Sequence, residues 1–135
     1  MKKKILRNEN TLLKDSERQF MEIFWSHPEP MTGNELAEYL TGKSWQQSNI
    51  LRTLSSLVEN GFLTVVGHTL IGKHYVRQFT AAVNREEYAV RAALSAGIEK
   101  SSLSDVSVRL AESVGGREDL IQSLETIIEA LKRES

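Results

Sequence analysis

Residues 46–56 place polar but mostly uncharged side chains on one side of a predicted helix. Apolar residues at Ile50, Leu54, Leu57 and Val58 recur at helical spacing and would form the buried side. The opposite side carries amides, hydroxyls and one guanidinium group: Gln46, Gln47, Ser48, Asn49, Arg52, Thr53, Ser55 and Ser56. Exposed helix surfaces usually carry Glu and Lys, whereas these groups can hydrogen-bond the base edges in a DNA major groove. The pattern therefore predicts a helix that reads DNA.

Ser48, Asn49 and Arg52 lie in the first turns of this helix, the end from which base contacts are mainly made. Arg52 can bind guanine through O6 and N7, and Asn49 can bind adenine through N6 and N7. The alternative is a solvated helix surface on which Arg52 forms an ion pair with Glu59 or another acid. We favour DNA contact for the surface as a whole.

The neighbouring positions are less specific. Gln46, Gln47 and Thr53 could contact either a phosphate or a base. Trp45, directly before the helix, could stack on the DNA backbone, but a place in the core between two helices explains a tryptophan there better.

Two shorter helices are predicted before this one. Asp15 or Ser16 would cap a helix that continues to His27, where the His-Pro-Glu-Pro sequence ends it; its buried positions are Phe20, Ile23 and Phe24. Thr32 and Glu35 form a capping-box pattern at the start of a second helix over residues 34–40, with Leu36 and Leu40 inward. A turn at residues 41–44 then leads to the third helix, residues 46–60.

A β-hairpin is predicted after the third helix. Gly61 stands where a helix end needs left-handed geometry, and residues 62–66 and 74–79 have the β-branched and aromatic composition of strands, with Gly67 and Gly72 around a loop. Three helices followed by a hairpin predict a winged helix-turn-helix domain over residues 14–80. Lys73, His74 and Arg77 would meet phosphates or the minor groove, with a solvated hairpin as the alternative. Tyr75 is assigned to the core of the wing.

Residues 84–134 are helical and amphipathic in pattern. Asn84 with Glu87 predicts a helix start, a second helix covers residues 103–113, and a last helix follows Gly115 and Gly116. The last helix has a wide apolar side formed by Leu120, Ile121, Leu124, Ile127, Ile128 and Leu131. So wide a side needs a partner surface, and too little chain remains for a separate core. We therefore predict a dimerisation region, the alternative being that this helix packs on its own N-terminal domain.

Composition limits the function classes. The chain has 135 residues, 40% of them apolar and 26% charged, with no cysteine, which indicates a globular protein without disulfides or thiolate metal sites. No signal peptide and no membrane-spanning run is present, so we expect a cytoplasmic protein. The three histidines are scattered and no catalytic arrangement can be assembled. We therefore expect neither an enzyme nor a cofactor nor a metal site.

Charge is distributed unevenly along the chain. The net charge is −1, but residues 1–80 carry ten Lys or Arg against eight Asp or Glu, and residues 81–135 carry seven against ten. Binding to nucleic acid depends on the local surface rather than on the total. Residues 1–13 form a basic arm in which Lys2, Lys3, Lys4 and Arg7 either follow the DNA backbone or only improve solubility.

Several segments together resemble the penicillinase repressors, the BlaI/MecI/CopY family of bacterial winged-helix repressors. LKDSERQFMEIFWSHPEPMTGNELAEYL is similar to the first two helices of that family, and WQQSNILRTLSSLVENGFLT to its recognition helix and the entry to the wing. GKHYV and NREEY resemble the exit from the wing and the start of the dimerisation region. The resemblance implies a homodimer that binds a palindromic DNA operator and represses transcription.

The sequence departs from the family pattern at three places. Arg77 and Phe79 replace a tyrosine and a proline after the wing, and Arg77 becomes a candidate phosphate contact. Arg109 and Leu110 stand where some members have the Asn-Phe pair that a sensor protease cuts. The C-terminal cysteine site of the copper-responsive members is missing. A repressor is the favoured function, and a winged-helix module that binds another protein through the same surface is the alternative.

Overall fold

The computed structural model describes residues 12–40 and 45–134. The basic residues of the predicted arm and the predicted turn at residues 41–44 therefore lie outside the described residues. The chain divides into two compact units, the first ending at Ala93 and the second beginning at Leu94. The predicted fold class is confirmed, because the described chain is mainly helical with one antiparallel hairpin.

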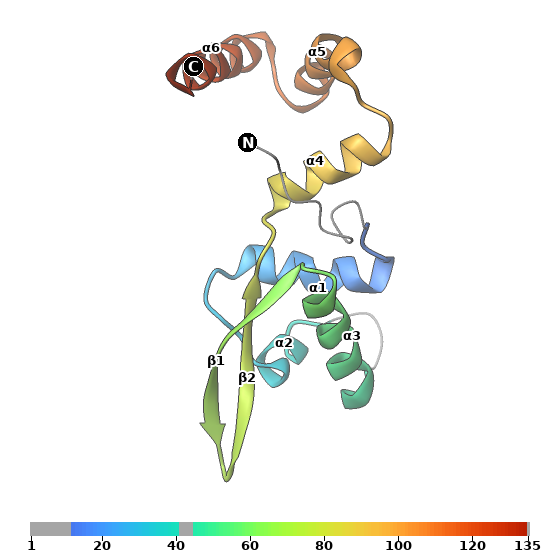
Figure 1. The fold of residues 1–135 in the computed structure, drawn as a ribbon, viewed down its shortest axis with the longest axis vertical. Coiled ribbons are helices and arrows are strands. Elements are labelled where there is room, and N and C mark those ends of the chain that lie inside the picture. Colours follow the sequence, from blue (N-terminus) through green and yellow to red (C-terminus); the bar gives the residue numbers. More distant parts are fainter. Residues whose placement is uncertain (1–11, 41–44, 135) are drawn as a thin grey trace. The chain divides into compact units, whose positions relative to one another are not determined.

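The first unit begins with the helices α1 (Asp15–Ser26), α2 (Gly33–Ala37) and α3 (Gln47–Glu59), labelled in Figure 1. The predicted cap of α1 at Asp15 or Ser16 is wrong, because the helix starts one residue earlier and Lys14 is the N-cap. The carboxylate of Glu17 reaches back and accepts a hydrogen bond from the Lys14 amide at 2.9 Å. That bond satisfies an N–H group which the helix itself leaves without a partner.

The capping box of α2 is confirmed. Thr32 Oγ1 accepts from the Glu35 amide at 3.2 Å, and Glu35 Oε1 accepts from the Thr32 amide at 2.8 Å. The helix is shorter than predicted, since it ends at Ala37 and residues 38–39 form a turn. Thr32 is itself buried, so the box fixes where α2 begins beside the hairpin.

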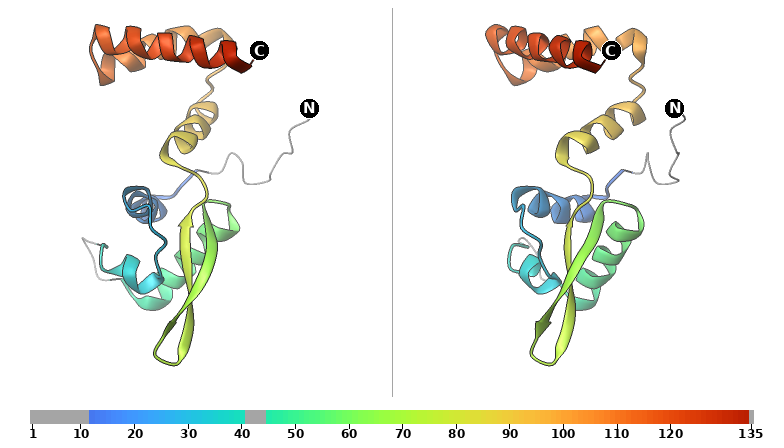
Figure 2. Two further views of the ribbon diagram at one scale, coloured as in Figure 1. Left: turned by 90° about the vertical axis from the view of Figure 1, so that its left-hand side faces the viewer. Right: turned by 60° about the vertical axis from the view of Figure 1, so that its left-hand side comes forward.

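The hairpin consists of β1 (Leu63–Ile71) and β2 (His74–Ala81), paired from Leu63 with Ala81 to Ile71 with His74. The predicted loop between Gly67 and Gly72 is wrong, because β1 continues through Gly67 with a register shift there. The turn contains only Gly72 and Lys73. Gly72 has φ +62°, as the first central residue of a type II′ turn requires. Figure 2 shows the hairpin extending well past the three helices.

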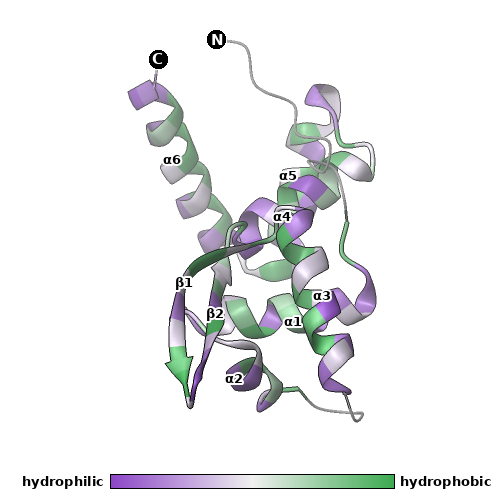
Figure 3. Ribbon diagram, turned by 60° about the horizontal axis from the view of Figure 1, so that its bottom comes forward, coloured by the Kyte–Doolittle hydropathy of each residue, from purple (hydrophilic) through white to green (hydrophobic). Residues whose placement is uncertain are grey.

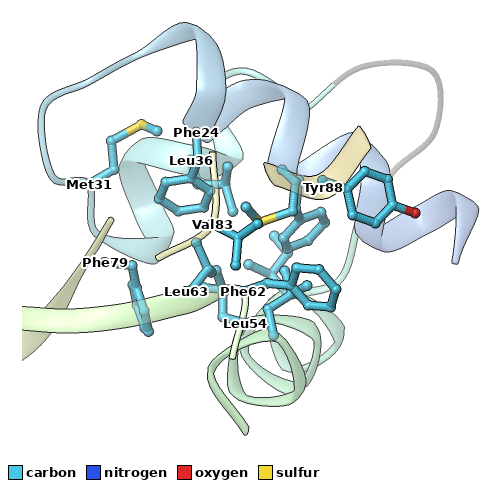
Figure 4. Close-up of a cluster of buried hydrophobic side chains, with 13 residues drawn as sticks. Phe24, Met31, Leu36, Leu54, Phe62, Leu63, Phe79, Val83 and Tyr88 are labelled. Carbon is cyan, nitrogen blue, oxygen red and sulfur yellow. The ribbon is translucent and has the colours of Figure 1, made fainter. Parts of the chain in front are cut away.

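One apolar core joins the helices of this unit to the base of the hairpin (Figure 4). The predicted positions Phe20, Phe24 and Leu36 are buried, as are Ile50, Leu54 and Leu57 of α3. The loop before α2 adds a short bridge to the sheet, in which Met31 and Phe79 exchange backbone hydrogen bonds of 3.0 and 2.7 Å. These contacts fix α3 and the hairpin in one frame.

The helix α4 (Arg85–Ser95) starts at the predicted capping box. Asn84 and Glu87 exchange hydrogen bonds of 2.8 and 2.7 Å. Tyr88 is buried in the core of the first unit, and its hydroxyl accepts from the Leu13 amide at 2.9 Å. The first turns of α4 therefore belong structurally to the first unit.

The second unit contains a short 3₁₀ helix (Lys100–Ser102) and the helices α5 (Leu103–Val114) and α6 (Arg117–Glu134). Neither α5 nor α6 has a buried residue in the single chain. Hydrophobic positions recur along α6 between hydrophilic ones in Figure 3. Within residues 12–40 and 45–134, no helix combines the length and the apolar composition needed to span a membrane.

Candidate nucleic-acid interface

The outer side of α3 is polar and open to solvent. Gln46, Gln47, Ser48 and Arg52 are exposed, and Asn49 and Thr53 are partly exposed. The first turn contains no acidic residue, so nothing in it opposes the partial positive charge that a helix N-terminus presents to phosphates. The predicted division of this helix into a buried and a polar side is confirmed except at Ser56, which is partly buried and donates to Glu17 of α1 at 3.5 Å. Contact of the polar side with DNA stays a prediction.

Asn49 and Arg52 interact with each other. Asn49 Oδ1 accepts a hydrogen bond from Arg52 Nη1 at 3.4 Å. This bond is long for an N–H···O pair, so both groups can exchange it for a stronger partner at modest cost. It also holds the two side chains on the same side of the helix, the arrangement in which they could address adjacent base pairs.

The cationic residues of the hairpin are also exposed. Lys73 is in the turn, His74 begins β2, and Arg77 lies three residues further along the strand. The Arg77 guanidinium lies 5.1 Å from the centre of the Phe79 ring, a cation–π contact with a buried ring. That contact orients Arg77, and Phe79 can donate the bond to Met31 because it is not a proline.

A hollow of about 450 Å³ joins α3 to the hairpin through the start of α2. It brings two of the predicted contact residues together, Gln47 from α3 and Arg77 from β2. The other predicted contacts lie outside its lining. Its full lining is Thr32, Gly33, Asn34, Ala37, Trp45, Gln47, Ile50, Leu51, Tyr75, Val76, Arg77 and Phe79. Helix and wing therefore form one surface around this hollow.

The sequence suggested that Tyr75 lies in the core of the wing, and this prediction is wrong. Its side chain is 74% exposed and lies opposite Leu70, which is also exposed. The hairpin extends past the helices, and among the described residues of the first unit none covers this end of its surface. Strand alternation alone could not have shown this, because Tyr75 shares a side of β2 with the buried Phe79 as well as with the cationic Arg77.

Two further residues and the local charge bear on the predicted surface. Trp45 packs against the core as favoured, with its ring centre 5.0 Å from that of Phe20. His68, one of the three scattered histidines, is exposed and pairs with Arg77 across the hairpin. Residues 45–80 contain three Lys or Arg and one acidic residue, Glu59. The surface formed by α3 and the wing is thus locally positive although the whole chain is not.

The sequence model of the penicillinase repressor family matches residues 13–130. The chain belongs to this family. This match confirms the resemblance to the family. It also confirms that the chain is a winged-helix transcription regulator. No curated protein matches the sequence of this family member.

Among solved structures, this penicillinase repressor family member is similar to several proteins at low sequence identity. MarR from Staphylococcus aureus, in complex with salicylate and kanamycin, is 16% identical, with 91% of this chain and 76% of that chain covered and a TM-score of 0.44. A mutant of ZitR from Lactococcus lactis is 11% identical, with 99% and 81% covered and a TM-score of 0.41. The adhesin competence repressor AdcR from Streptococcus pyogenes is 16% identical, with 93% and 83% covered and a TM-score of 0.38.

Proposed function

We propose that the protein is a sequence-specific transcriptional repressor that binds a palindromic operator as a homodimer. The observation behind the proposal is the surface formed by α3 and the wing, where exposed amide, hydroxyl and guanidinium groups adjoin the cations of the hairpin. Amides and guanidinium groups recognise base edges, and cations recognise phosphates. Repression would follow when the bound dimer covers a promoter.

In the proposed complex the first turns of α3 enter the major groove. Ser48, Asn49 and Arg52 face the bases there, while Gln46, Gln47 and Thr53 contact bases or phosphates. Lys73, His74 and Arg77 meet the backbone or the neighbouring minor groove. The apolar inner side of α3 is anchored in the core through Ile50, Leu54 and Leu57, so the helix is presented to DNA on a rigid support.

The dimer is proposed from the exposed apolar side of α6. Leu120 and Ile127 border a hollow of about 680 Å³ shared with α5, whereas Ile121, Leu124, Ile128 and Leu131 point to a side that α5 leaves open, each at least 39% exposed. A single-chain surface of this kind is stabilised by a second copy. Two-fold symmetry of the dimer then requires two inverted half-sites in the DNA.

The test is selection of bound fragments from genomic DNA, followed by binding measurements over a range of salt concentrations. Two phosphate contacts per protomer, from Lys73 and Arg77, give four per dimer. The logarithm of the binding constant should then fall against that of salt with a slope of about −3.6. Absence of any DNA complex at low salt would contradict the repressor and favour the protein-binding alternative.

Replacing Lys73 with alanine should weaken binding to operator and to random DNA by the same factor. Lys73 is exposed in the hairpin turn, where a side chain can reach a phosphate but has no support for a fixed base contact. The salt slope should become less negative by about 1.8, because each protomer then neutralises one phosphate fewer. Fluorescence anisotropy on both DNAs measures this, with Lys100→Ala in the second unit as the matched control. A loss confined to the operator would show that Lys73 reads sequence.

A further inference from the structure

Leu51 is a large apolar residue on the side of α3 proposed to read DNA. Its side chain is 44% exposed. Gln47 and Ser55, one turn before and after it, lie on the same side of the helix and are polar and exposed. The core of the unit does not account for Leu51, because the buried residues of α3 are Ile50, Leu54 and Leu57. Its exposure on a polar surface therefore calls for another explanation.

The start of α2 lies beside Leu51 and leaves room for its side chain. A Cβ atom placed on Gly33, the first residue of α2, would lie 3.7 Å from Leu51 Cδ2, which is ordinary van der Waals contact. The rest of the side chain borders the hollow that Gln47 and Arg77 also line. Leu51 therefore borders the hollow beside the start of α2 and is open toward the surface where the bases would lie.

We propose that Leu51 determines sequence specificity by packing on the C5 methyl group of a thymine in the major groove. The inference rests on the proposed DNA binding and deepens it. Thymine is the base that presents a methyl group on the major-groove side, and apolar side chains recognise it there. Against another base, Leu51 would cover a polar edge without supplying a hydrogen bond, which costs free energy. The neighbouring Gln47 and Arg52 supply hydrogen bonds to adjacent positions.

The experiment removes the methyl group alone. Each thymine of the selected operator is replaced in turn, in both half-sites, by deoxyuridine, which keeps the O4 acceptor and the pairing with adenine. At one thymine per half-site we expect wild-type affinity to fall about fourfold for each methyl removed, equivalent to about 0.8 kcal/mol. The Leu51→Ala variant should bind the thymine operator more weakly by a similar factor for each half-site. It should not distinguish thymine from uracil at that position.

Leu12→Ala is the matched control, because Leu12 is 41% exposed and lies outside the lining of the hollow. This variant should keep the full difference between thymine and uracil, and thermal unfolding checks that both variants are folded. If the wild type binds every uracil duplex as tightly as the operator, the methyl contact is overturned while the DNA-binding function stands. A uracil effect that persists in Leu51→Ala assigns the methyl to another residue and overturns the role of Leu51. Failure of the wild type to select any DNA overturns the proposed function and this inference with it.

Discussion

Replacing Leu124 and Ile128 with aspartate is expected to convert the protein into monomers and to lower its affinity for the operator by at least about 100-fold. Both residues lie on the side of α6 that α5 leaves open, 39% and 50% exposed in the single chain. In a dimer they would be buried, and two carboxylates per chain in an apolar interface are strongly unfavourable. Loss of the dimer removes the gain in affinity that comes from binding two linked half-sites.

The measurement is mass by light scattering, with operator binding measured on the same samples. Gln122→Asp with Thr126→Asp is the matched control, because these exposed residues have the same four-residue spacing and add the same two charges beside the hollow shared with α5, away from the open side of α6. The control should remain dimeric and bind the operator normally. A dimeric Leu124→Asp, Ile128→Asp variant would mean that the proposed interface lies elsewhere.

Local chemistry predicted much of the fold from the sequence. The capping boxes at Thr32 and Asn84 each depend on two side chains three residues apart, so the sequence contains all the partners involved. The buried side of α3 follows in the same way from the spacing of Ile50, Leu54 and Leu57. Where an element is specified by its own residues, prediction and structure agree.

The errors lie where partners come from elsewhere or where two patterns compete. The sequence suggested that Asp15 or Ser16 caps α1, but Glu17 is drawn inward, where it is buried and Ser56 of α3 donates to it at 3.5 Å, and this shifts the start of the helix. Gly67 suggested a loop, yet the pairing of the two strands continues past it through a register shift. Both outcomes depend on tertiary context that the local sequence does not contain.

The candidate site was also predicted from the sequence only in part. The polar side of α3 could be identified from residue type and spacing, because its chemistry is unusual for a solvated helix. Tyr75 was missed because an aromatic residue was assigned to the core by default, and Leu51 because it was assigned to neither side of α3. Only the structure shows that both are exposed within the described residues and that they line the same hollow as Gln47 and Arg77.

Replacing Arg52 with alanine should remove sequence preference more than affinity for DNA in general. A bidentate contact with guanine discriminates against other bases by about 2 kcal/mol, so operator binding should fall roughly thirtyfold per half-site. Binding to random DNA should change much less, since it depends on phosphate contacts. Arg52 is exposed and its hydrogen bond to Asn49 is long, so the fold should be unaffected. The ratio of dissociation constants for operator and random DNA measures the effect.

Arg52→Lys separates the geometry of the side chain from its charge. Lysine keeps the positive charge but lacks the planar pair of donors that matches guanine O6 and N7. If Arg52 reads a base, the lysine variant should bind random DNA like the wild type and still lose most of its preference for the operator. If Arg52 only attracts phosphates, lysine should restore binding to both DNAs and alanine should weaken both equally. Both variants lack the planar pair of donors, and only the lysine variant keeps the positive charge. Equal losses of operator affinity in the two variants would therefore show that the guanidinium group itself recognises the base.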